Sequence, residues 1–146
     1  AGRWVSVGVD LFRGTTYRAV RGAGAWRDGQ PLGRRRPVST VEAVVGVNGW
    51  TATRPPGGQV RSMGCAALEL CAVADGGLDA YVNRDVGGHG PWDYLGGLLV
   101  ATEAGAVAAE RSGRDLNEVG HDVRREVVVA AGDELLDELV AWGGAA

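Results

Sequence analysis

Lysine and isoleucine are absent from this chain of 146 residues, so all 15 of its basic residues are arginines. This usage is typical of a GC-rich bacterium and indicates no particular chemistry. No apolar run approaches the roughly 20 residues that a membrane-spanning helix needs, and no charged segment followed by an apolar one marks a secretory signal. We therefore expect a protein of the cytoplasm that neither crosses a membrane nor is exported.

Cysteine is also scarce, since Cys65 and Cys71 are the only two. They lie six positions apart in a segment that we interpret as a helix, where a rotation of about 600° places them on different faces. We expect no disulfide between them, and two thiols without framework spacing fit a reducing cytoplasm. No Cys or His group has the spacing of a zinc site.

Hydrophobic residues make up 45% of the chain and charged residues 23%, which excludes a disordered chain or a fibre. We predict a single domain over 1–146, with a β-rich basic segment over 1–61 and an acidic segment of helices and strands over 62–146. The first segment contains ten arginines and three acidic residues, and the second contains five arginines and fifteen acidic residues. We interpret this split as two packed segments of opposite charge. An anionic ligand or nucleic acid on the basic side is the alternative.

Valine-rich and alternating runs between turn signals predict strands, and apolar segments with glycine stops predict helices. The expected strands are 5–10 and 15–20, joined as a hairpin, then 42–48, 78–83, 106–109 and 126–131. The expected helices are 64–75, 94–104 and a last one capped by Asp133, while the glycine-rich stretch from 22 to 37 is expected to be loop. This order predicts an α/β fold, a layered mixed sheet with flanking helices.

Asp93 stands out among the polar side chains. It follows Pro91 and Trp92 at the start of the second apolar helix, where a carboxylate meets the positive end of the helix dipole. An Asp in this position is a good N-cap, worth about 0.5–2 kcal/mol. Spacing alone favours the cap and leaves a metal or catalytic role open.

Four segments resemble the C-terminal half of the inositol monophosphatase family, in the same order and with the same spacing. They are Gly64-Cys65-Ala66-Ala67-Leu68-Glu69-Leu70-Cys71, Ala74-Asp75-Gly76-Gly77-Leu78-Asp79-Ala80-Tyr81, Pro91-Trp92-Asp93 and Thr102-Glu103-Ala104-Gly105-Ala106. Residues 8–29 are similar to the strand pair and glycine turn that precede these segments in the family. The resemblance therefore extends over most of the chain and implies the C-terminal αβα half of that fold.

The resemblance implies a hydrolase that cleaves phosphate monoesters of small molecules with the help of Mg²⁺ ions, which bind the phosphate and activate water. It implies that Asp93 is a metal ligand and that the backbone at Gly64, Cys65 and Ala66 flanks the substrate. Asn83 falls where inositol-specific members often carry a glutamate that contacts a substrate hydroxyl. A neutral Asn still forms hydrogen bonds, but it weakens the case for inositol.

The sequence also departs from the family. The other metal ligands of the family lie in a Glu-Glu segment and an Asp-Pro-x-Asp-Gly-Thr segment, and neither segment occurs in 1–146. One carboxylate does not hold a Mg²⁺ cluster. The family's helix between Val45 and Gly64 is missing as well, and 49–61, with two prolines, takes its place.

These departures, with a start that lacks methionine, lead us to expect a chain that is inactive without a metal-binding N-terminal half. Its expected partners are such a complementary half or a second copy of the chain. The alternative is a non-catalytic family remnant that serves as a binding or dimerisation module.

Other candidates have simpler interpretations. His89 and His121 lie on glycine-flanked loops and are interpreted as solvated side chains. Arg34-Arg35-Arg36 is interpreted as an exposed loop, and nucleic acid is not expected as a partner, because no aromatic interleaving or known motif accompanies it. Trp92 is expected in the core.

Overall fold

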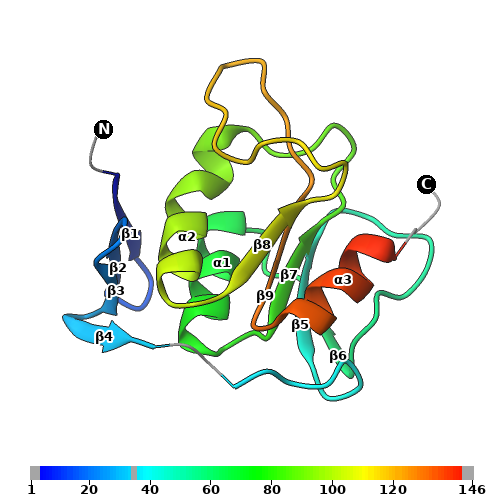
Figure 1. Cartoon of the computed structure of the whole chain (residues 1–146), viewed down its shortest axis with the longest axis horizontal. Helices are drawn as coiled ribbons and strands as arrows, with labels where there is room; N and C mark the ends of the chain where they lie inside the picture. Colours follow the sequence, from blue (N-terminus) through cyan, green and yellow to red (C-terminus); the bar gives the residue numbers. More distant parts are fainter. Residues whose placement is uncertain (1–3, 34–35, 143–146) are drawn as a thin grey trace.

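The chain folds into four layers, which Figure 1 shows side by side. They are a four-stranded sheet, a pair of helices, a five-stranded sheet and a last helix. The computed structural model describes residues 4–33 and 36–142, so the expected loop at Arg34 and Arg35 lies outside the described residues. This arrangement confirms the predicted α/β fold with a layered sheet and flanking helices.

The first sheet is antiparallel throughout, with strands in chain order. Its strands are β1 (Val5–Asp10), β2 (Thr15–Val20), β3 (Gly24–Arg27) and β4 (Gln30–Leu32). The hairpin of β1 and β2 is confirmed, but the prediction of loop from residue 22 onward is wrong. Asp28 and Gly29 have φ of 49° and 80°, as the two central residues of a tight hairpin turn require, so this turn joins two strands that are too short to show alternation.

The second sheet has the order β6-β5-β7-β9-β8. Its strands are β5 (Val44–Asn48), β6 (Gln59–Arg61), β7 (Ala80–Asn83), β8 (Val107–Glu110) and β9 (Val127–Ala130). β5 pairs in parallel with β6 and β7, whereas β9 is antiparallel to both of its neighbours. The sequence predicted all of these strands except β6, which is a three-residue edge strand.

The three helices are α1 (Ala66–Asp75), α2 (Pro91–Glu103) and α3 (Asp133–Ala141). α1 ends as predicted, because Gly76 adopts the left-handed conformation that stops a helix. The expected N-caps are wrong: Gly90 caps α2 and Gly132 caps α3, so Asp93 and Asp133 lie inside the first turn. There a carboxylate still interacts favourably with the helix dipole.

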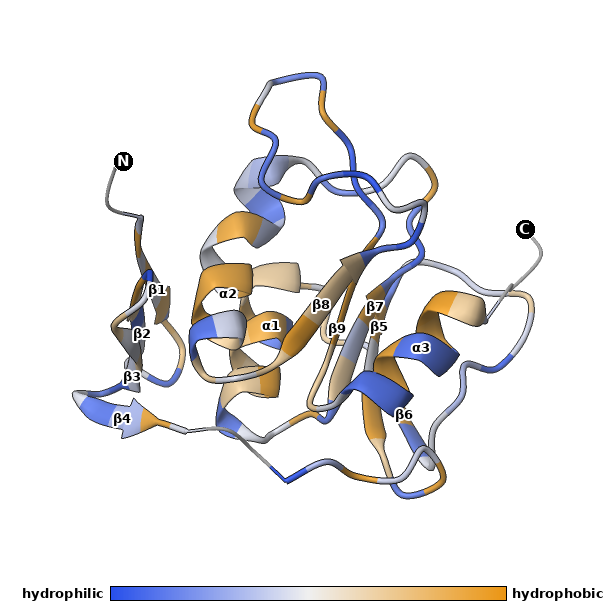
Figure 2. Ribbon diagram, viewed as in Figure 1, coloured by the Kyte–Doolittle hydropathy of each residue, from blue (hydrophilic) through white to orange (hydrophobic). Residues whose placement is uncertain are grey.

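Two apolar cores occupy the two faces of the second sheet, because successive strand residues point to opposite sides. On one face Tyr81 and Val129 pack against α1, α2 and the first sheet. On the other face Val82 and Val128 pack against the leucines of α3. Figure 2 shows hydrophobic colours on much of α1, α2 and the second sheet, whereas α3 combines hydrophobic with strongly hydrophilic residues. α1 and α2 are therefore held between two sheets, and their positions are strongly constrained.

The loop between β5 and β6, where the resemblance implies a helix, packs against the second sheet. Pro55 is buried, and a Cβ added at Gly57 would lie only 2.8 Å from Val45 Cγ2. The Trp142 indole donates a hydrogen bond of 3.1 Å to Thr53 Oγ1 from the far end of the chain. Val45 is fully buried and belongs to the core that includes the leucines of α3, and Gly57 of this loop packs against it.

The basic and acidic segments are in direct contact. Arg27 Nη1 lies 3.0 Å from Asp75 Oδ2, to which Tyr17 also donates a hydrogen bond of 2.6 Å. Opposite charges thus meet between the first sheet and α1. In the part of the chain that the structure describes, no helix combines the length and the apolar character that crossing a membrane requires.

Candidate functional site

Cys65 and Asp93 line one cavity of about 270 Å³. It lies between β1 and the first turns of α1 and α2, and Gly8, Leu68 and Trp92 are among the residues of its walls. Gly97 also lines it, and this residue packs without a side chain against α1, so the two helices lie close together here. The structure thus brings together two of the residues that the resemblance implies for a site.

The start of α1 presents exposed backbone to this cavity. Gly64 has φ of 73°, in the region that favours glycine, and Cys65 is the N-cap with no side-chain capping hydrogen bond. Cys65 therefore lies just before the helix, whereas the sequence analysis had placed it within the helix. The Cys65 thiol is exposed and free, and the first N–H groups of the helix can bind an anion.

Glu69 anchors this loop and was missed by the sequence analysis. Its carboxylate is fully buried, Oε1 accepts a hydrogen bond of 2.9 Å from Met63 N, and Oε2 has no hydrogen-bond partner in the described residues. Burial raises the pKa of Glu69. An acidic residue in the middle of an otherwise apolar helical run was the signal that could have identified it.

Asp93 lies on the other side of the cavity, in the first turn of α2. Its Oδ2 accepts a hydrogen bond of 3.1 Å from Gly90 N, and its own N–H donates one of 3.0 Å to Gly90 O. These contacts hold the carboxylate at the helix start. No other hydrogen bond to the carboxylate occurs in the described part of the chain, so Oδ1 is available to a ligand.

Asn83 is not part of the wall of this cavity. Its side chain is fully buried, its Nδ2 donates a hydrogen bond of 3.3 Å to Arg125 O, and its Oδ1 accepts one of 2.9 Å from Asp85 N. It therefore braces the end of β7 against a later loop. Its amide does not line the cavity that Cys65 and Asp93 share.

His89 is buried beside the same strand end, so the expectation of a solvated histidine is wrong. Only 8% of the residue is exposed, and Nε2 lies 2.8 Å from the Tyr81 hydroxyl and 3.4 Å from Asn48 Nδ2. Its backbone exchanges two hydrogen bonds of 2.9 Å with Arg125. This pairing with a distant loop, which the local sequence does not show, fixes the turn that precedes Gly90 and Asp93.

Acidification is expected to weaken the fold through His89. Burial lowers the pKa of this histidine, although Asp85 and Asp93 partly oppose the effect. The unfolded chain therefore takes up a proton as the pH falls through about 6.5 while the folded chain does not, which costs up to about 1.4 kcal/mol per pH unit. The free energy of unfolding, measured with urea from pH 7 to 5, should decline in this window.

The variant His89→Gln should lose most of this slope. His121→Gln is the matched control, because the His121 side chain is 89% exposed, as predicted, and its replacement should leave the slope unchanged. An unaltered slope in His89→Gln would contradict the assignment.

Trp92 is 59% exposed, so the prediction that it belongs to the core is wrong. Its ring centroid lies 5.5 Å from that of His121, and the Arg124 guanidinium carbon lies 5.0 Å from it. Because it sits one position before Asp93 and also lines the cavity, Trp92 forms part of the rim of the candidate site.

Cys65 also borders a larger groove of about 830 Å³ between the β1–β2 hairpin and α1. Arg13, Arg27 and Arg61 line this groove. Arg13 and Arg27 pair with aspartates, whereas the Arg61 guanidinium donates to Gln59 Oε1 and Val60 O and has no carboxylate partner in the described residues. Asp10 and Asp75 also line this groove, so Arg61 is the arginine there whose charge is available to an anionic ligand.

The residues present do not form a magnesium site by themselves. Asp93 offers an available carboxylate oxygen, which is a ligand that Mg²⁺ prefers, but the ion needs several such ligands. Residues 4–33 and 36–142 contain no group of three or more His, Cys, Asp and Glu side chains that could hold a metal. Asp93 by itself offers one ligand, and a magnesium site here would need further ligands from outside the described residues.

The chain is similar to proteins of known family. The sequence model of the Inositol monophosphatase family matches residues 5–142. Human inositol monophosphatase 1 is 32% identical over 145 residues, which cover 88% of this chain and 49% of the human protein. The chain thus spans about half the length of this relative.

Solved structures show that the fold of this chain is similar to that of known proteins. A hypothetical protein from Pyrococcus horikoshii with similarities for inositol-1 monophosphatase superposes with a TM-score of 0.82 at 22% identity, over 93% of this chain and 55% of that one. Inositol monophosphatase II from Staphylococcus aureus superposes with a TM-score of 0.76 at 25% identity, over 94% and 55%. These likenesses agree with the observed layers.

Proposed function

This chain belongs to the inositol monophosphatase family, and on that premise we propose that it contributes the C-terminal part of a Mg²⁺-dependent phosphate monoester hydrolase. The observation that carries the proposal is the cavity that Asp93 shares with the start of α1. In this proposal Asp93 is a metal ligand, and the backbone at Gly64, Cys65 and Ala66 flanks a phosphorylated small molecule. The bound ions would supply charge neutralisation for the phosphate.

The remaining metal ligands are proposed to come from a complementary N-terminal half, because Asp93 alone is insufficient. The first sheet offers a surface for it. β1 is an edge strand, and Val5, Val7 and Val9 are 61%, 67% and 48% exposed. An apolar row along an unpaired strand favours pairing with another chain. A second copy of this chain is the other proposed occupant.

We propose phosphate monoesters as the substrate class and do not narrow it to inositol phosphates. Asn83 is retained as a proposed substrate contact, and reaching a ligand would require its amide to leave Arg125 O and Asp85 N. A neutral amide in this place does not favour inositol over another alcohol. We propose the cytoplasm as the location, because both thiols are free.

Complementation tests the proposal. The chain alone should release no phosphate from inositol 1-phosphate, and mixing it with the N-terminal half of human inositol monophosphatase 1 should give Mg²⁺-dependent release. Asp93→Asn should lower this release about 100-fold or more, because a metal ligand contributes several kcal/mol to transition-state stabilisation. Phosphate release is measured by a colorimetric assay.

Asp122→Asn is the matched control, since the Asp122 side chain is fully exposed, and it should keep the activity. Retained activity in Asp93→Asn would overturn the proposed role. A complex that forms but stays inactive would favour the alternative, a non-catalytic binding or dimerisation module. That module should show a melting temperature that Mg²⁺ does not change.

A further inference from the structure

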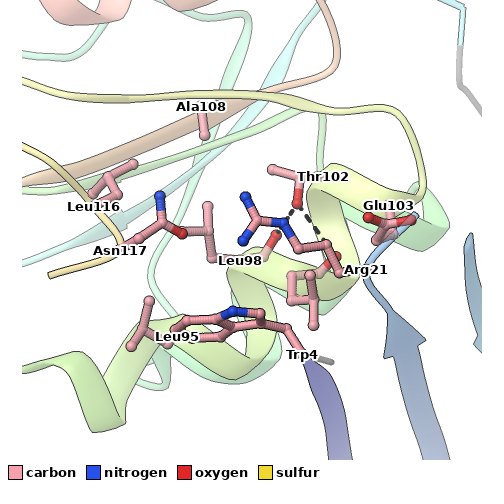
Figure 3. A pocket seen from close by; sticks show the side chains of 10 residues that line it. Trp4, Arg21, Leu95, Leu98, Thr102, Glu103, Ala108, Leu116 and Asn117 are labelled. Carbon is pink, nitrogen blue, oxygen red and sulfur yellow. Dashed lines mark hydrogen bonds between the residues drawn. The ribbon is translucent and has the colours of Figure 1, made fainter. Parts of the chain in front are cut away.

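A second cavity lies on the opposite face of α2 and has no part in the proposed function. The candidate site uses Asp93, Gly97 and Val100, whereas this cavity of about 300 Å³ uses Leu95, Leu98, Leu99, Thr102 and Glu103. It is closed by Trp4 and Arg21 from the first sheet and by Leu116 and Asn117 from the loop after β8 (Figure 3). Its volume is at the lower limit for sites of small molecules.

The wall has an apolar part and a polar part. The leucines, Ala108 and Trp4 form the apolar part, whereas Arg21, Thr102, Glu103 and Asn117 form the polar part. Leu98 is buried, Leu95, Leu99 and Leu116 are half-buried, and Trp4 is 40% exposed. The Thr102 hydroxyl donates its proton to Leu98 O at 2.8 Å, so it faces the cavity only as an acceptor. The floor can therefore accommodate a hydrocarbon chain or ring.

Arg21 is the cationic residue that lines this cavity, and Figure 3 shows its guanidinium pointing into it. Its backbone N–H donates a hydrogen bond of 3.0 Å to Trp4 O, which keeps the two residues next to each other at the end of the sheet. Within residues 4–33 and 36–142 the guanidinium has no ion pair or hydrogen bond, in contrast to Arg13 and Arg27.

Glu103 does not neutralise this cation. Its two carboxylate oxygens accept hydrogen bonds of 2.8 and 2.9 Å from Gly22 N and Gly24 N, and no oxygen of Glu103 lies within 4.0 Å of the guanidinium. The carboxylate instead ties the turn after Arg21 to the end of α2. Arg21 thus keeps its donors available on a backbone that is anchored from both sides.

We propose that this cavity binds a small organic monocarboxylate with an apolar body. The guanidinium fork matches a carboxylate in a bidentate geometry. The hydrocarbon body would lie against Trp4 and the leucines of α2. A phosphate would fit less well, because the oxygens beyond the two that the guanidinium binds would face the leucines without a donor.

The indole N–H signal of Trp4 in NMR spectra, assigned with Trp4→Phe, reports on binding directly. Titration with 4-phenylbutyrate should shift this signal with saturation, and the neutral 4-phenylbutan-1-ol should bind about tenfold more weakly, because a hydrogen bond to a charged group is lost. Inorganic phosphate should produce no saturable shift.

Arg21→Gln should weaken 4-phenylbutyrate binding about tenfold and leave the alcohol unaffected. Arg18→Gln is the matched control, because Arg18 is exposed on the same sheet and stacks on Trp26 outside the cavity, and it should bind like the unaltered chain. Equal binding of acid and alcohol, or full binding by Arg21→Gln, would overturn the proposal. So would shifts at the other tryptophans with none at Trp4.

Discussion

Gly97→Val should destabilise the fold by about 3 kcal/mol or more. α1 and α2 touch at this position, and a Cβ added to Gly97 would lie 2.8 Å from Ala67 O and 2.8 Å from Leu70 Cβ. One of these is backbone and the other is a fully buried side chain. Since both helices are held between two sheets, the extra methyl groups cannot be relieved by a small shift, and overpacking of this kind is costly.

Urea unfolding followed by circular dichroism measures this loss. Gly96→Val is the matched control one residue earlier in the helix, where the nearest atom to an added Cβ is Ser6 Oγ at 3.2 Å and the position is exposed. It should change the free energy of unfolding by less than about 1 kcal/mol. Equal losses in the two variants would show that the helix contact at Gly97 is not the cause.

Glu110→Gln should cost about 3 kcal/mol at pH 7. The buried carboxylate accepts four hydrogen bonds: Ser112 N and Arg114 N donate to Oε2 at 2.7 and 3.1 Å, while Arg114 Nη2 and Glu126 N donate to Oε1 at 2.6 and 3.2 Å. A glutamine amide would turn an N–H group toward two of these donors. Unsatisfied buried groups next to a charged partner carry penalties of this size.

The pH dependence identifies the carboxylate as the cause. Burial by itself would raise the pKa of Glu110, but the hydrogen bonds from Arg114 and from backbone N–H groups outweigh it and hold the pKa at about 2, against an ordinary 4.5. Its stabilisation is complete above 4.5 and is lost as the pH falls toward 2.

The difference in unfolding free energy between the unaltered chain and Glu110→Gln should therefore shrink from pH 5 to pH 2.5. Glu138→Gln, on the exposed side of α3, should show no such difference at any pH. A difference for Glu110→Gln that stays constant with pH would exclude the charged carboxylate as its source.

Much of the fold was predictable because its signals are local. The hairpin of β1 and β2, the valine-rich strands and the glycine that ends α1 follow from alternation and turn chemistry within a few residues. β3, β4 and β6 were not predicted, because they are short, lack a valine-rich run and follow glycines that resemble loop. They are strands because neighbouring strands pair with them.

The candidate site was predictable only in part. The motif that contains Asp93 indicated its importance, but its place inside the helix depends on the backbone of Gly90. The histidine at 89 was misjudged because its burial comes from Tyr81 and from a bridge to Arg125, which no local pattern contains. Trp92 was expected in the core but is exposed, since aromatic character alone does not show which face of a helix is covered.

The sequence by itself determined the family, the α/β class and the residue types available for chemistry, because these depend on the order of motifs and on local periodicity. Only the tertiary structure decided that Cys65 and Asp93 share a cavity, that His89 is buried and that Arg21 faces a second cavity without an ion pair in the described residues. Burial and proximity depend on which distant segments pack together. The contact of Gly97 with α1 is an example, because it joins two helices that are separate in the sequence.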